Sequence, residues 1–337
     1  MDPRTLTVRK ASEMIGQNLQ KHFEALNARM KFKASADPSY DDVEKACTAL
    51  RRLAKGDRTL FYYNGHGVPK PTPSGELWVF NEDYSQYIPI SIIQLQSWLA
   101  SPTIYVWDAT AAGSLLTNFL LSAERRGENL RQRYGQQLEN APPGLRPYSE
   151  CIQMVSCLAD ETLPMCPELL ADLFTSCLTG PIDTAVLYFI LTQQLPSSPS
   201  LDLDIVGKIP GETKDRRTPL CELNWILTAV TDTIAWTTFP RHLFQKLYRS
   251  DLIIAALSRN FLLAERVMKI YRCTPHTSPP LPSTNTHPLW SARDMALDGC
   301  LKQISAYMDA KKAAREDGEQ LRMSFGTISP ASSWFII

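Results

Sequence analysis

Short apolar runs that alternate with helical segments are the feature of this sequence that most restricts its fold. Three runs are rich in β-branched and aromatic residues and are typical of buried strands: RTLFYYN (58–64), TIYVWDAT (103–110) and CIQMVSCLA (151–159). Apolar residues spaced three and four apart predict helices between or before them, over residues 8–26, 43–53 and 111–126. Strands alternating with helices predict an α/β fold whose parallel sheet is covered on both faces.

The pattern changes after about residue 165, where strand signals fade. Helices are predicted over roughly 181–194, 219–236, 240–249, 251–271 and 289–314. Consecutive helices with short links favour a layer of stacked helical repeats of the armadillo or HEAT kind. We therefore expect two domains, residues 1–210 and residues 211–337.

Local signals add detail to this outline. Ser39 followed by Asp42 predicts a capping box, and Ser91 is expected to cap a helix that runs through Leu99. The run ELWVF (76–80) predicts a short strand beside the first one. The Pro- and Thr-rich segment 273–288 is interpreted as a connector between two helices.

Composition excludes several classes of protein. Lys plus Arg and Asp plus Glu each number 35, so a net charge of zero gives no support to a nucleic-acid or membrane-surface partner. The longest apolar runs fall short of the ~20 residues that a membrane helix needs. The first ten residues, MDPRTLTVRK, do not resemble a secretory signal, so we expect a cytoplasmic protein.

The eight cysteines are interpreted as reduced, buried thiols because most of them lie inside apolar segments. Their spacing fits no common zinc pattern. We therefore expect neither a metal nor another cofactor.

Two loops of the predicted sheet carry the candidate site. His66, between Gly65 and Gly67, follows the first strand, and DATAAG (108–113) follows the second. Loops at the carboxyl ends of parallel strands hold ligands and catalytic groups, and two neighbouring loops can meet there. Such an arrangement suits a base from one loop and a nucleophile from the next.

The order strand, NGHG, strand and D-x-x-x-x-G resembles the caspase and metacaspase family. Longer stretches resemble the Raptor family of scaffold subunits more closely. These stretches are residues 9–24, 63–108, 171–182, 208–236 and 240–271, and together they cover most of residues 9–310. The resemblance implies a caspase-like sheet flanked by helices, then the start of an α-solenoid, in a subunit of the TOR kinase complex.

The resemblance also locates the position of a peptidase nucleophile. The cysteine of that class aligns with Thr110, or with Ala109 after a shift of one residue, and neither is cysteine. Raptor sequences usually begin this loop with Asp-Cys-Ser, so Ala109 departs from the family pattern. A threonine hydroxyl stays protonated near neutral pH and, inside a chain, lacks the N-terminal amine that threonine nucleophiles use as a base.

The sequence therefore predicts a pseudo-peptidase without catalytic residues. In this interpretation His66 stabilises its turn with a hydrogen bond, and Asp108 caps the following helix or accepts loop amides. A peptidase that uses Thr110 with His66 is the enzymatic alternative.

By resemblance, the family binds the TOR kinase and captures substrate peptides that carry a TOR signalling motif, an aromatic anchor followed by an acidic residue. Its groove lies where the caspase-like domain meets the solenoid, which in this chain includes residues 214–226. Arg216 and Arg217 are the candidate peptide-binding residues because a guanidinium fork matches a carboxylate. Alternatively, one of them pairs with Asp215 or caps a helix carbonyl. Trp225 and Trp236, eleven residues apart, are expected on one helix face in the core.

Two departures from the family pattern leave a third interpretation. Raptor proteins normally begin with a further strand, without which the sheet would expose an edge, and they continue through a long solenoid. The match fades beyond about residue 311, where the apolar ending TISPASSWFII follows. The third interpretation is therefore that the chain is a truncated fragment that acts neither as a scaffold nor as a peptidase. The family resemblance also implies recruitment to the lysosome or vacuole surface as part of the complex.

Overall fold

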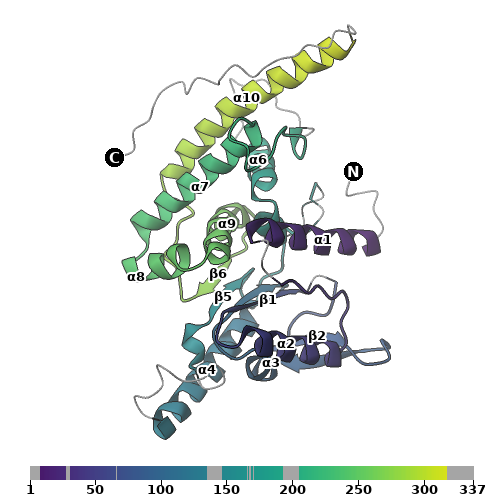
Figure 1. The fold of residues 1–337 in the computed structure, drawn as a ribbon, viewed down its shortest axis with the longest axis vertical. Helices are drawn as coiled ribbons and strands as arrows, with labels where there is room; N and C mark the ends of the chain where they lie inside the picture. The colour runs from purple at the N-terminus through teal and green to yellow at the C-terminus, as the bar shows by residue number, and fades with distance from the viewer. Residues whose placement is uncertain are drawn as a thin grey trace. The chain divides into compact units, whose positions relative to one another are not determined.

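The computed structural model describes residues 8–27, 31–65, 67–134, 146–164, 166, 168–169, 171–192 and 205–316 (Figure 1). The strands are β1 (Thr59–Asn64), β2 (Glu76–Phe80), β3 (Tyr87–Ser91), β4 (Thr103–Asp108), β5 (Ile152–Val155) and β6 (His276–Ser278). The α-helices are α1 (Val8–Leu26), α2 (Tyr40–Ala54), α3 (Ile92–Leu99), α4 (Gly113–Tyr134), α5 (Leu173–Thr179), α6 (Pro181–Thr192), α7 (Pro219–Thr238), α8 (Arg241–Phe244), α9 (Leu252–Met268) and α10 (Leu289–Glu316). Short helical segments are η3 (Tyr148–Glu150), η5 (Gln245–Arg249) and η6 (Lys269–Tyr271).

Contacts divide the chain into two compact units that interleave along the sequence. Unit 1 comprises Met1–Thr179 and Thr238–Asn285, and unit 2 comprises Gly180–Thr237 and Thr286–Ile337. These units are defined by contacts and do not test the domain boundary at residue 210 that the sequence suggests. That boundary stays a prediction.

The main sheet of unit 1 has the order β1-β4-β5-β6. β1 and β5 both pair with β4 in parallel, which confirms the predicted parallel sheet. β6 pairs with β5 in antiparallel orientation, so the sheet is mixed. This strand was missed because it lies inside the Pro-rich connector 273–288, and three residues are too few for an alternating pattern to show.

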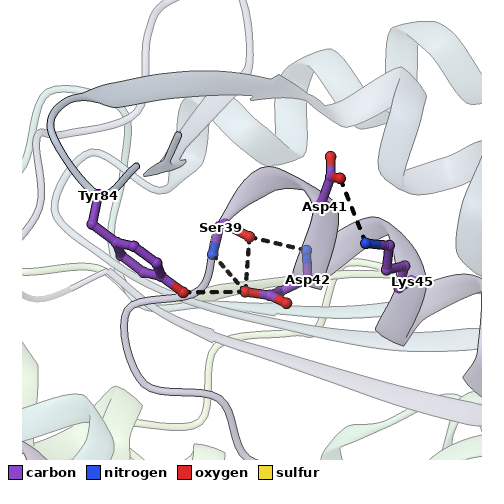
Figure 2. A network of polar contacts seen from close by, with 5 residues as sticks. All are labelled: Ser39, Asp41, Asp42, Lys45 and Tyr84. Carbon is purple, nitrogen blue, oxygen red and sulfur yellow. Dashed lines mark hydrogen bonds and ion pairs between the residues drawn. The ribbon is translucent and has the colours of Figure 1, made fainter. Parts of the chain in front are cut away.

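The predicted strand 76–80 exists as β2, but its predicted place beside β1 is wrong. β2 pairs with β3 in a separate two-stranded sheet, and β1 is an edge strand of the main sheet. This hairpin is tied to the start of α2 (Figure 2).

At the start of α2, Ser39 Oγ accepts a hydrogen bond from the Asp42 amide, and the Asp42 carboxylate accepts one from the Ser39 amide, so the predicted capping box is confirmed. The Tyr84 hydroxyl of the hairpin donates to the same carboxylate over 3.4 Å (Figure 2). The predicted Ser91 cap of α3 is also confirmed.

Both faces of the main sheet are covered by helices, as the apolar strands predict (Figure 1). On one face Tyr105 of β4 packs against Phe119 of α4, with ring centroids 5.0 Å apart. On the other face Tyr62 of β1 meets Phe23 of α1, with centroids 6.4 Å apart. α2, α3 and α4 pack in succession on the first side, and α1, α5 and α9 contact one another on the second.

Unit 2 is helical in the part of the chain that the structure describes. α6, α7 and α10 share an apolar core, as expected for a helical segment. Its buried members are Ile182, Val186, Phe189, Ile190, Ile205, Ile209, Leu223, Leu297, Leu301 and Ile304. Within the described residues, no helix is both long enough and apolar enough to cross a membrane.

Arg51 near the end of α2 connects the segments that lead into β1 and β4. One end of its guanidinium, Nη1, donates to the Asp57 carbonyl over 2.8 Å. The other end, Nη2, donates to the Pro102 carbonyl over 2.8 Å and to the Thr59 hydroxyl over 2.8 Å. A planar fork with several donors is needed to reach all of these acceptors at once.

We predict that Arg51→Lys lowers the free energy of unfolding by about 2–4 kcal/mol. A single ammonium cannot span the carbonyls and hydroxyls that the fork reaches, so buried acceptors lose their donors. The measurement is urea-induced unfolding followed by circular dichroism. Arg52→Lys, at the exposed neighbouring position, is the matched control and should change stability by no more than about 0.5 kcal/mol. Equal losses in both variants would contradict the role given to Arg51.

Candidate functional site

The loops after β1 and β4 meet, as the sequence predicts. Asn64 and Asp108, the last residues of the two strands, are paired in register. Immediately beyond them the Gly65 amide donates to the Asp108 carbonyl over 2.8 Å. A Cβ at Gly65 would lie 2.9 Å from the Ala109 Cβ, so glycine is needed for this close approach. His66 lies outside the described residues, and its predicted hydrogen bond stays a prediction.

The loop at 108–113 is packed against the loop after β5. Ala109 is 1% exposed, and its amide donates to Ser156 Oγ over 3.3 Å. The Cys157 thiol donates to the Ala109 carbonyl over 3.2 Å, and the Ala111 amide donates to the Glu161 carbonyl over 3.0 Å. Position 109 is therefore closed off from solvent.

Position 110 carries the loop's only hydroxyl. Thr110 is half-buried, and its Oγ1 accepts a hydrogen bond from the Leu163 amide over 3.3 Å. Neither Ala109 nor Thr110 supplies a thiol, and the Thr110 oxygen is engaged with the backbone of the neighbouring loop.

Asp108 has a different role from the one predicted. It is 0% exposed and accepts hydrogen bonds from the Tyr62 hydroxyl over 2.8 Å and from Asn64 Nδ2 over 3.3 Å. It also contacts Thr175 Oγ1 at the start of α5. The predicted helix cap is therefore wrong for Asp108, whose side chain meets side chains from β1 and α5.

The cap at α5 is Asp172, a residue that sequence reasoning did not single out. Its Oδ1 accepts from the Phe174 amide over 2.9 Å and from the Thr175 amide over 3.0 Å. An aspartate two and three residues before helical amides is a recognisable capping signal in ADLFTS. Its proximity to Asp108, by contrast, depends on tertiary structure.

Thr175 lies between the two buried carboxyl groups. Its hydroxyl is 2.7 Å from Asp172 Oδ2 and also contacts Asp108 Oδ2. A hydroxyl has one proton, so it can donate to only one of the two carboxyl groups. Burial raises the pKa of Asp108 well above its usual range, and the nearby charge of Asp172 raises it further. Both effects favour the protonated form of Asp108.

The candidate peptide-binding arginines lie on a tight loop before α7 in unit 2. The Arg217 amide donates to Asp215 Oδ1 over 3.1 Å, and the Thr218 hydroxyl donates to the Asp215 carbonyl over 2.8 Å. Gly211 has a positive φ of 115°, and a Cβ there would lie 2.1 Å from the Thr218 Cβ, so glycine is required. Arg216 and Arg217 are both exposed, and no ion pair joins either guanidinium to Asp215 in this described stretch.

The two tryptophans of α7 do not lie in the core. Trp225 is 71% exposed and Trp236 is 62% exposed, so their predicted burial is wrong. Their shared helix face is not the one that packs on α6 and α10, because Leu223 fills that side. Among the described residues, no group of three or more His, Cys, Asp or Glu side chains is arranged to hold a metal ion.

The chain is similar to known proteins over most of its length. A family model described as "Raptor N-terminal CASPase like domain" matches residues 1–119. The target of rapamycin complex 1 subunit mip1 of Schizosaccharomyces pombe is 51% identical over 311 residues, covering 92% of this chain and 23% of mip1. The regulatory-associated protein of TOR 1 of Arabidopsis thaliana is 46% identical over 304 residues, covering 90% of this chain and 21% of that protein.

The fold is similar to a solved structure as well. The crystal structure of Chaetomium thermophilum Raptor matches with a TM-score of 0.79 and 49% sequence identity, covering 89% of this chain and 27% of that chain. This chain therefore spans about a quarter of the length of the relatives that it matches.

We predict that Asp108→Asn flattens the dependence of stability on pH. A folded-state pKa above the ordinary value of about 3.9 means that the folded protein keeps a proton that the unfolded chain releases. The resulting stabilisation is complete below that value and is lost as the pH rises through the folded-state pKa. Asparagine carries no such proton, so the variant should lose less stability than the native chain between pH 5 and pH 8.

The measurement is urea-induced unfolding at several pH values across that range. Asp160→Asn, at an exposed position beyond β5, is the matched control and should leave the slope unchanged. A slope in Asp108→Asn as steep as in the native chain would show that Asp108 is ionised in the folded protein.

Proposed function

The chain is a Raptor homologue that corresponds to the N-terminal, caspase-like region of that family, and we propose that it acts as a non-enzymatic scaffold in TOR signalling. The observation that carries this proposal is the similarity to subunits of target of rapamycin complex 1 across nine tenths of the chain. In this proposal the TOR kinase is the principal partner. The proposal includes a cytoplasmic location for the chain and its recruitment, as part of the complex, to the lysosome or vacuole surface.

The structure of the strand-end loops supports a role without catalysis. A cysteine peptidase needs an ionised thiol that a substrate can reach. Here position 109 is a buried alanine, and the hydroxyl at position 110 accepts a backbone hydrogen bond. No specific observation favours the alternative in which Thr110 and His66 hydrolyse peptides.

We further propose that the chain recruits substrates by binding a peptide with an aromatic anchor and an acidic residue. The loop before α7 supports this proposal, because its internal hydrogen bonds leave two adjacent guanidinium groups exposed. An unpaired guanidinium can bind a carboxylate with two parallel hydrogen bonds, and the Asp215 carboxylate does not compete for this role in the described structure.

We predict that Arg216→Ala and Arg217→Ala each weaken binding of such a peptide about tenfold, since each removes a charge-assisted hydrogen bond worth about 1–2 kcal/mol. The measurement is fluorescence anisotropy with a labelled peptide. A second peptide, with the acidic residue replaced by its amide, should bind the native chain weakly and bind both variants equally weakly.

Arg52→Ala is the matched control because Arg52 is an exposed arginine on α2, in the other unit. It should leave peptide affinity unchanged. Equal affinity in the native chain and both loop variants would refute the assignment of Arg216 and Arg217. Absence of binding by a natively folded chain would refute peptide recruitment by this region.

The scaffold role has a separate test. Co-precipitation of the tagged chain with TOR kinase from cells measures the kinase interaction directly. A cooperative melt of the isolated chain would exclude the interpretation that it is a poorly folded fragment. If a cooperatively folded chain does not co-precipitate with TOR kinase, the proposed scaffold function is contradicted.

A further inference from the structure

Two thiols from distant parts of the sequence meet where β5 and β6 diverge. Cys157 follows β5, Cys273 precedes β6, and the last pair of the ladder between these strands is Val155 with His276. The two cysteines are 0% and 2% exposed. The Cys273 sulfur lies 3.6 Å from the carbonyl oxygen of Ser156, the residue next to Cys157. The antiparallel pairing therefore brings both sulfur atoms to one place inside unit 1.

Hydrogen bonds to Glu161 join the two segments that carry these thiols. Glu161 accepts hydrogen bonds from the Thr274 amide over 2.8 Å and from the Thr274 hydroxyl over 2.9 Å. The same carboxylate accepts from the Leu158 amide over 2.9 Å. These bonds fasten the residue after Cys273 to the residue after Cys157, so the two thiols are held together by the backbone around them.

The two thiols differ in acidity. The contact with Cys273 is the main cause that lowers the pKa of Cys157; burial opposes it, and the backbone amides of Ala112 and Ala111 support it. The same contact raises the pKa of Cys273. Burial instead raises the pKa of Cys47, in α2, to about 12. Of the two thiols, Cys157 is therefore the one that ionises more readily.

We propose that Cys157 and Cys273 form a redox-active dithiol site that a small hydroperoxide oxidises to a disulfide. In the first step the Cys157 thiolate attacks the peroxide oxygen, an S–O bond forms as the O–O bond breaks, and the leaving oxygen takes a proton. Cys157 is then a sulfenic acid.

In the second step the Cys273 sulfur attacks the sulfenic sulfur. The S–S bond forms, the S–O bond breaks, and the hydroxide leaves as water with the Cys273 proton. In sum, the two thiols lose two electrons and two protons. The hydroperoxide is reduced to water and an alcohol, or to two waters when it is hydrogen peroxide.

Burial selects the class of oxidant. Reaction of a thiolate depends on access as well as on its ionisation. Two sulfur atoms with almost no exposed surface admit a small, neutral hydroperoxide more readily than a bulky, charged disulfide such as oxidised glutathione. The product would join the end of β5 to the segment before β6, beside the Ala109 carbonyl that Cys157 contacts.

The test uses the native chain and hydrogen peroxide. After exposure, the remaining thiols are blocked with N-ethylmaleimide, and the linked peptides are identified by digestion and mass spectrometry. We expect a linked pair that contains Cys157 and Cys273, lighter by two hydrogen atoms than the reduced peptides and restored by dithiothreitol. Oxidised glutathione should form this link at least about tenfold more slowly.

Variants distinguish the two thiols. In Cys273→Ser the sulfenic acid on Cys157 has no thiol to resolve it, so dimedone should label Cys157 there and not in the native chain. Cys47→Ser is the matched control, because it removes another buried thiol, and the yield of the Cys157–Cys273 link should not change.

Circular dichroism confirms that each tested chain is folded. If the cysteine variants fail to fold, the peptide map of the native chain decides by itself. A folded native chain that is oxidised only at the half-exposed Cys221 and Cys300, with no link between Cys157 and Cys273, would overturn the proposal.

Discussion

The burial of β4 is the constraint on which the rest of unit 1 depends. All six residues of this strand are buried, because strands pair with both of its edges and helices cover both of its faces. Parallel pairing of β1 with β4 places the ends of these strands side by side, so Gly65 and Ala109 come into contact. The same burial surrounds Asp108, the last residue of β4, and raises the pKa of its carboxyl group.

The loops after β1 and β4 lie where parallel sheets often carry catalytic groups, but in this chain they are packed into the core. Backbone hydrogen bonds join the loop at 108–113 to the loop after β5, and Thr110 takes part in this packing through its hydroxyl. Beneath them, Thr175 and the Asp108–Asp172 pair connect β4 to the start of α5. Side chains of the protein supply the hydrogen bonds of this cluster, and Asp108 Oδ1 is the buried oxygen in it that lacks a partner among the described residues.

In unit 2 the candidate peptide-binding groups are exposed side chains outside the apolar core. The loop from Gly211 to Thr218 is held by its own hydrogen bonds, and this leaves Arg216 and Arg217 exposed to solvent. Trp225 and Trp236 show that an eleven-residue spacing identifies one helix face without telling which face is buried. α7 is apolar on more than one side, and only packing against α6 and α10 determines that Leu223 is covered.

Local patterns in the sequence determined the secondary structure and much of the fold. The capping boxes at Ser39 and Ser91, the strands 59–64 and 103–108, and the helices of unit 2 were predictable because their signals depend on residues a few positions apart. The absence of cysteine at positions 109 and 110 was also evident from the sequence. Only the tertiary structure decided that β6 joins the sheet, that Asp108 contacts Thr175 of α5 instead of capping α4, and that Cys273 lies beside the residue next to Cys157. Each of these contacts joins segments far apart in the chain, and the free energy that selects them comes from burial and pairing across the fold, which local spacing does not encode.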